Sequence, residues 1–124
     1  MDSVYDLYQR GRELLQSGDY EAAIVPLSRA RNLEPGKASI RETLGRALFH
    51  ARRYESAAAE FEAVASETPT DDYALFCLGR SMQLLGRHRE ACQPLALACS
   101  LRPEREDYRV YRDRARRDAR PRAA

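Results

Sequence analysis

The chain repeats itself with a period of 34 residues, and this repeat constrains its fold more than any other feature. A glycine followed by an arginine recurs once in each period, at Gly11, Gly45 and Gly79. The same period relates an alanine, a large apolar residue and a proline, namely Ala23, Leu27 and Pro35, then Ala57, Phe61 and Pro69, and then Ala91, Leu95 and Pro103. Self-similarity at a period of about 20–50 residues is the signature of a stacked repeat architecture.

Each period has the pattern of two amphipathic helices. In the second period, Leu44 and Leu48 share one helical face, and Tyr54, Phe61 and Val64 share another. Each proline ends the second helix because it cannot continue the hydrogen-bond ladder. The pattern predicts helices over residues 4–17, 20–33, 38–51, 54–67, 72–85 and 88–101. We expect each recurring glycine to face an alanine of its partner helix, which lets the two helices approach closely.

Residues 104–118 predict a seventh helix that caps the stack. Tyr108, Tyr111 and Ala115 form one narrow apolar stripe, and arginines and acids surround it. A stacked repeat needs a polar terminal cap because its last unit otherwise exposes an apolar face. We expect residues 119–124 to form a frayed basic tail.

The pattern resembles the tetratricopeptide repeat. The residues that carry the resemblance are Leu7, Gly11, Leu14, Tyr20, Ala23, Leu27, Ala30 and Pro35 in the first copy, Leu44, Gly45, Leu48, Tyr54, Ala57, Phe61, Val64 and Pro69 in the second, and Leu75, Leu78, Gly79, Met82, Ala91, Leu95, Ala98 and Pro103 in the third. The resemblance implies an all-α fold, a right-handed α-solenoid of three antiparallel helix pairs with a seventh capping helix. The chain then forms one domain over residues 1–118, with repeats at about 4–37, 38–71 and 72–103. It departs from the family at Arg10 and Arg41, where an apolar residue is preferred, and at His88, where tyrosine is usual.

In tetratricopeptide proteins the first helix of each pair lines a concave groove that holds an extended peptide or a partner helix. The resemblance implies that the groove residues here are Tyr5, Tyr8, Arg12, Glu42, Arg46, His50, Tyr73, Phe76, Cys77 and Arg80. Arg12, Arg46 and Arg80 form an arginine column, one per repeat, and the same period continues to Arg114. Such a groove suits an acidic, partly apolar peptide or C-terminal tail, because guanidinium groups bind carboxylates through paired hydrogen bonds.

Two other interpretations concern the same residues. The arginines of the column could lie along local partners one turn back, which are Tyr8 for Arg12, Glu42 for Arg46 and Phe76 for Arg80. Some family members hold the C-terminal carboxylate of heat-shock chaperones with a clamp rich in lysine and asparagine. The corresponding positions here are Tyr8, Arg12, Thr43, Tyr73 and Cys77, so we do not expect chaperone-tail binding of that type.

We therefore predict a non-catalytic adaptor or scaffold that binds another protein. One alternative is a self-associating homo-oligomer that uses the capping helix. Another is an RNA- or ribosome-associated factor that uses the arginine-rich C-terminal end. Against nucleic acid, four acids interleave with the eight arginines of residues 105–122, and no further aromatic residue is placed for base stacking.

The composition disfavours most other classes. Three cysteines do not make a disulfide framework, and with two histidines they do not predict a metal site. The chain has no phosphate-cradling glycine loop and no Ser/His/Asp set, so we predict neither catalytic residues nor a cofactor. No apolar run is long enough for a membrane span. The first residues lack the basic start and apolar stretch of an export signal, so we expect a cytoplasmic protein.

Overall fold

The computed structural model describes residues 2–121, and within them the chain forms seven α-helices. The helices are α1 (Val4–Gln16), α2 (Tyr20–Leu33), α3 (Ala38–His50), α4 (Tyr54–Glu67), α5 (Asp72–Leu84), α6 (His88–Leu101) and α7 (Glu106–Asp118). The first six predicted helices agree with these bounds to within one residue. The seventh begins at Glu106 and not at residue 104, because Pro103 and Glu104 form the preceding turn. Part of the predicted frayed tail, residues 122–124, lies outside the described residues.

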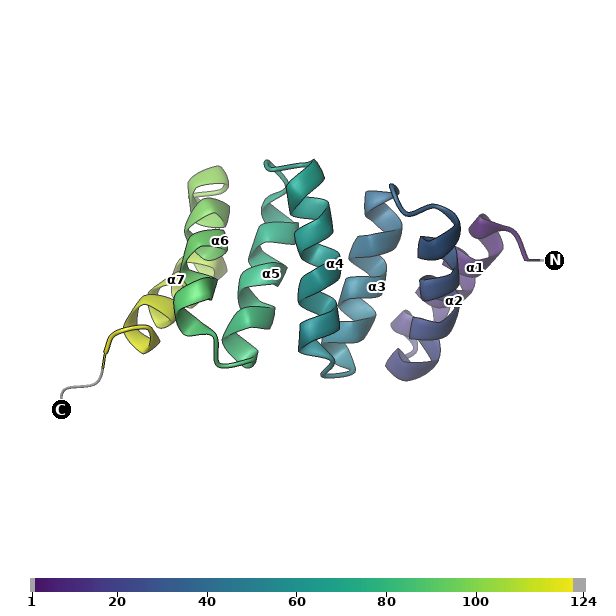
Figure 1. The fold of residues 1–124 in the computed structure, drawn as a ribbon, viewed down its shortest axis with the longest axis horizontal. Coiled ribbons are helices and arrows are strands. Elements are labelled where there is room, and N and C mark those ends of the chain that lie inside the picture. The colour runs from purple at the N-terminus through teal and green to yellow at the C-terminus, as the bar shows by residue number, and fades with distance from the viewer. Residues whose placement is uncertain (1, 122–124) are drawn as a thin grey trace.

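The helices stand in one row, in chain order (Figure 1). Each helix packs against the one before it and the one after it, and α1 also contacts α3 as α5 contacts α7. In Figure 1 the second helices of the pairs, α2, α4 and α6, lie in front of α1, α3 and α5, so the molecule has two layers. The predicted all-α solenoid of three helix pairs and a seventh helix is confirmed. None of the seven helices is long and apolar enough to cross a bilayer.

The recurring glycines make room for large residues of the partner helix. A Cβ added at Gly45 would lie 2.7 Å from Cζ of Phe61, and one at Gly79 would lie 2.5 Å from Cγ of Leu95. Gly11 faces a leucine of α2 in the same way. The expectation that each glycine faces an alanine was therefore wrong: the large side chain occupies the volume that a Cβ would need.

The turn inside each helix pair requires a left-handed residue. Gly18 and Gly86 adopt φ values of 86° and 78°, and Arg52 adopts 64° at the same position of the second pair. The amide of Arg53 then donates to the carbonyl of Leu48 at 2.8 Å, which closes the end of α3 in the usual helix-terminating pattern. An arginine here carries the cost of the left-handed region, which glycine avoids.

A carboxylate lies inside the apolar stripe of α4. Glu60 is only 5 % exposed. Its two oxygens accept from Arg31 at 2.6 Å and from Arg41 at 3.0 Å, so helices α2, α3 and α4 are joined by one charged cluster. This cluster explains why Arg41 stands where the repeat family prefers an apolar residue: its guanidinium neutralises a buried charge.

Helix α7 covers the end of the stack formed by α5 and α6. Of its predicted apolar stripe, Tyr108 and Ala115 are fully buried and Tyr111 is half-buried. The hydroxyl of Tyr108 donates to Asp72 at 2.6 Å. The period places Asp113 where the earlier repeats have their glycine, and Asp113 is exposed. A following helix could not bury a large apolar residue against this charge, so α7 ends the stack.

Candidate functional site

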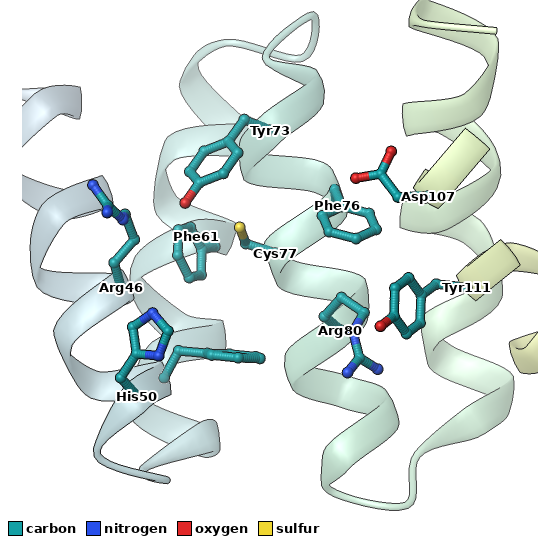
Figure 2. A pocket seen from close by; sticks show the side chains of 10 residues that line it. Arg46, His50, Phe61, Tyr73, Phe76, Cys77, Arg80, Asp107 and Tyr111 are labelled. Carbon is teal, nitrogen blue, oxygen red and sulfur yellow. The ribbon is translucent and has the colours of Figure 1, made fainter. Parts of the chain in front are cut away.

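A hollow of about 450 Å³ opens on the face formed by the first helices of the pairs and α7. We call it the aromatic hollow. Its lining residues are Arg46, Phe49 and His50 of α3, Phe61 of α4, Tyr73, Phe76, Cys77 and Arg80 of α5, and Asp107 and Tyr111 of α7. Figure 2 shows their side chains around one space, with the sulfur of Cys77 near its centre. The structure thus brings together six of the predicted groove residues, Arg46, His50, Tyr73, Phe76, Cys77 and Arg80.

Four lining residues were missed by the sequence analysis. Tyr111 and Asp107 lie 34 residues after Cys77 and Tyr73, so continuing the period into the seventh helix would have found both. Phe61 was assigned to packing alone, yet its ring also meets the ring of Tyr73 edge-on, with centroids 6.3 Å apart. No spacing rule singled out Phe49, which follows its own helix and packs edge-on against the neighbouring rings of α3 and α4.

Arg80 is fixed against the capping helix. Its guanidinium lies 3.9 Å from the ring centroid of Tyr111 and donates to Oε1 of Gln83 at 2.9 Å. The amide of Gln83 in turn donates to the carbonyl of Tyr111 at 2.9 Å. Burial lowers the pKa of Arg80. The alternative that Arg80 lies along Phe76 was wrong, because Phe76 stacks on Tyr108 instead, with centroids 4.5 Å apart.

The period continues into α7 as the sequence suggests. The guanidinium of Arg114 lies 5.1 Å from the ring centroid of Tyr111, so this ring contacts the last two members of the arginine column. Tyr111 therefore separates two positive charges at the end of the groove, and a cation–π contact holds each of them in place.

Arg46 keeps its charge uncompensated. Among residues 2–121 it forms no ion pair, although Glu42 lies one turn before it. Burial, followed by a hydrogen bond with Asp71, raises the pKa of Glu42 to about 8, so this carboxyl holds a proton at neutral pH. Asp71 itself caps α5 by accepting from the amide of Ala74 at 3.0 Å. The predicted Glu42 partner of Arg46 is thus engaged elsewhere.

Cys77 and Tyr73 are poor candidates for nucleophilic chemistry. Burial raises the pKa of the Cys77 thiol to about 12 and also raises the pKa of Tyr73. The thiolate is the nucleophilic form of cysteine, so a thiol protonated at neutral pH is inert. Within residues 2–121, no group of three or more His, Cys, Asp and Glu side chains could hold a metal ion.

A second hollow of about 290 Å³ adjoins the first, because Arg46 lines both. We call it the arginine hollow. Its lining residues are Tyr8, Arg12, Leu15, Gln16, Thr43 and Arg46. The guanidinium of Arg12 lies 5.6 Å from the ring centroid of Tyr8, which is the local partner that the sequence suggested. The arginine column therefore runs along the two adjoining hollows.

Tyr5 stands apart from the other predicted groove residues. It is 68 % exposed and lines a separate hollow of about 310 Å³ with Val4, Lys37 and Ile40 among others. Tyr8 lines this hollow as well as the arginine hollow, so Tyr5 extends the surface beyond the column.

Comparison with known proteins places this arrangement in a family. A family model for the tetratricopeptide repeat matches residues 8–72, more than half of the chain. Superkiller complex protein 3 of Mus musculus is 28 % identical over 100 residues, which cover 81 % of this chain; the chain spans only 6 % of the length of that curated relative.

Solved structures are similar along nearly the whole chain. A double mutant of MamA RS-1 superposes with a TM-score of 0.88 at 25 % identity, covering 94 % of this chain and 67 % of the other. A MamA fragment from Desulfovibrio magneticus RS-1 gives a TM-score of 0.82 at 23 % identity, covering 94 % and 71 %. The first tetratricopeptide domain of Spaghetti (RPAP3), bound to the HSP90 peptide SRMEEVD, gives 0.85 at 15 % identity, covering 92 % and 90 %.

Proposed function

The chain belongs to the tetratricopeptide repeat family, and on that premise we propose that it is a non-catalytic protein-interaction module. Its groove holds an acidic, partly apolar segment of another protein. The observation that carries this proposal is the arginine column: Arg12, Arg46 and Arg80 line two adjoining hollows next to aromatic rings, and no carboxylate of residues 2–121 pairs with them.

The other arginines show that this lack of pairing is selective. Exposed arginines elsewhere form ion pairs between repeats, as Arg53 does with Glu21 at 2.7 Å and Arg87 with Glu55 at 3.3 Å. The column thus offers free donors to an incoming carboxylate. A hydrogen bond to a charged group contributes about 1.5–3 kcal/mol, so two or three of them can position an acidic segment.

The aromatic hollow supplies the apolar part of the binding surface. Phe49, Phe61, Tyr73, Phe76 and Tyr111 form its walls. Rings that are already packed against one another lose little conformational entropy when a ligand binds, and central aromatic residues commonly dominate binding energy. The likeness to the Spaghetti domain, which was solved with a peptide, supports peptide binding by this fold.

The charge pattern of α7 supports a protein partner over RNA. Three of its neighbouring arginines pair locally with acids, namely Arg105 with Asp107, Arg112 with Asp113 and Arg117 with Asp118. Nucleic-acid affinity depends mainly on positive charge that is free to replace counterions. Helix α7 therefore offers less free charge to a polyanion than its arginine content suggests.

Selection from a random peptide display library tests the proposal. The full chain should enrich peptides that combine aspartate or glutamate with one large apolar residue. Arg46→Glu should abolish binding of the selected peptides, because it reverses the charge shared by both hollows. Arg53→Glu changes an exposed arginine away from the groove and serves as the matched control. Selection of no peptides, or equal binding by Arg46→Glu, would refute the proposal.

A further inference from the structure

The arginine hollow differs from the aromatic hollow in its chemistry. Two of its six lining residues are the guanidinium groups of Arg12 and Arg46, which come from neighbouring repeats. None of the lining residues is an acid. Leu15 is the only purely apolar side chain among them, so this part of the groove is built for a polar ligand group.

The hydrogen-bond network decides which groups are free to bind a ligand. The hydroxyl of Thr43 donates its one hydrogen to the carbonyl of Ser39 at 2.7 Å. The contact of 3.3 Å between Tyr8 and Thr43 must then have the tyrosine hydroxyl as donor. Both hydroxyl hydrogens are thus used inside the protein. The donors left for a ligand are those of Arg12, Arg46 and the amide of Gln16.

We propose that the arginine hollow is a phosphate-binding subsite, which takes a phosphorylated side chain of the segment held in the groove. The inference rests on the proposed function and specifies the partner's charged group. A phosphoryl group carries close to two negative charges at neutral pH and three acceptor oxygens. Two uncompensated guanidiniums match that charge, and each can donate two parallel hydrogen bonds. A single carboxylate would neutralise only one of them.

The neighbouring acids do not oppose an anion in this hollow. Glu42, one turn before Arg46, is protonated at neutral pH through its hydrogen bond with Asp71. Asp107 lines the aromatic hollow and pairs with Arg105 at 2.7 Å. The phosphorylated residue therefore lies toward α1, and the apolar anchor of the same segment lies toward α5 and α7, with Arg46 between them.

Two measurements test this subsite on the full chain. The first uses small probes, phenyl phosphate and benzoate, and follows the Nε–Hε signals of the arginines by NMR. Phenyl phosphate should shift Arg12 and Arg46 in a saturable way and bind about tenfold more tightly than benzoate, since its charge is twice as large. Arg53, which is paired with Glu21, should not respond. Equal binding of the two probes, or shifts spread over all arginines, would overturn the inference.

The second measurement uses peptides from the display selection, each synthesised with serine, glutamate or phosphoserine at its acidic position. The phosphoserine form should bind about tenfold more tightly than the glutamate form. Arg12→Gln and Arg46→Gln should each remove this preference, and Arg10→Gln, on an exposed arginine paired with Asp2, should keep it. A preference that is absent in the wild type, or that persists in both groove variants, would overturn the inference, whereas failure of the selection itself would count against the proposed function.

Discussion

Replacing Gly45 with alanine tests how the helix pairs are packed. The new Cβ would lie 2.7, 2.9 and 3.0 Å from Cζ, Cε2 and Cε1 of Phe61, whereas carbon atoms normally touch at about 3.5–4.0 Å. Phe61 is fully buried and cannot swing aside, so α3 and α4 must move apart. Overpacking of this kind costs about 1–3 kcal/mol. Alanine favours the helix over glycine by about 1 kcal/mol, which leaves a net loss of about 1–2 kcal/mol.

Urea unfolding followed by circular dichroism measures this loss. With a slope of about 2 kcal/mol per molar urea, the midpoint should fall by about 0.5–1 M. Gly36→Ala is the matched control, because no atom lies within 4 Å of its added Cβ, and it should leave the midpoint unchanged or raise it. Phe61→Val removes the three ring atoms, so in that background Gly45→Ala should cost almost nothing. A midpoint unaffected by Gly45→Ala, or a loss that persists beside valine, would refute this account of the packing.

Three further predictions concern single side chains. Arg52→Gly should raise the free energy of unfolding by about 0.5–1 kcal/mol in urea titrations, since glycine tolerates the left-handed turn. Glu60→Ala should lower it by about 1–3 kcal/mol, measured in the same way, because Arg31 and Arg41 lose their shared carboxylate. The pKa of Glu42 is raised to about 8 by folding, so its contribution to stability is complete below about pH 4.5 and is lost as the pH rises through 8; unfolding midpoints of the wild type should therefore fall over this range more steeply than those of Glu42→Gln.

The sequence predicts the helices well because local rules determine where they begin and end. The prolines and the glycine turns are visible in the chain itself, and the period repeats them, so errors in one copy are corrected by the others. The glycine contacts were mispredicted because a period relates equivalent positions but does not say which residues face each other across a helix pair. Gly45 and Phe61 are 16 residues apart, and only the packed structure shows that they meet.

The site was predicted in part for the same reason. The column of Arg12, Arg46 and Arg80 follows from the period and lies along the hollows as expected. The partner of Arg80 does not, because Tyr111 reaches it from α7 and not from its own helix. The protonation of Glu42 also depends on Asp71, which comes from the next repeat, so no local pattern indicates it.

The row of helices has a mechanical consequence. Because each helix packs mainly on its sequence neighbours, the stack can open from either end without disturbing the far repeats. The aromatic hollow draws its lining from α3, α4, α5 and α7 at once. A segment seated there acts as a brace across rods that otherwise lean only on the next in line, so detachment of α7 would first require the guest to leave, and tighter grip and a stiffer scaffold would rise together.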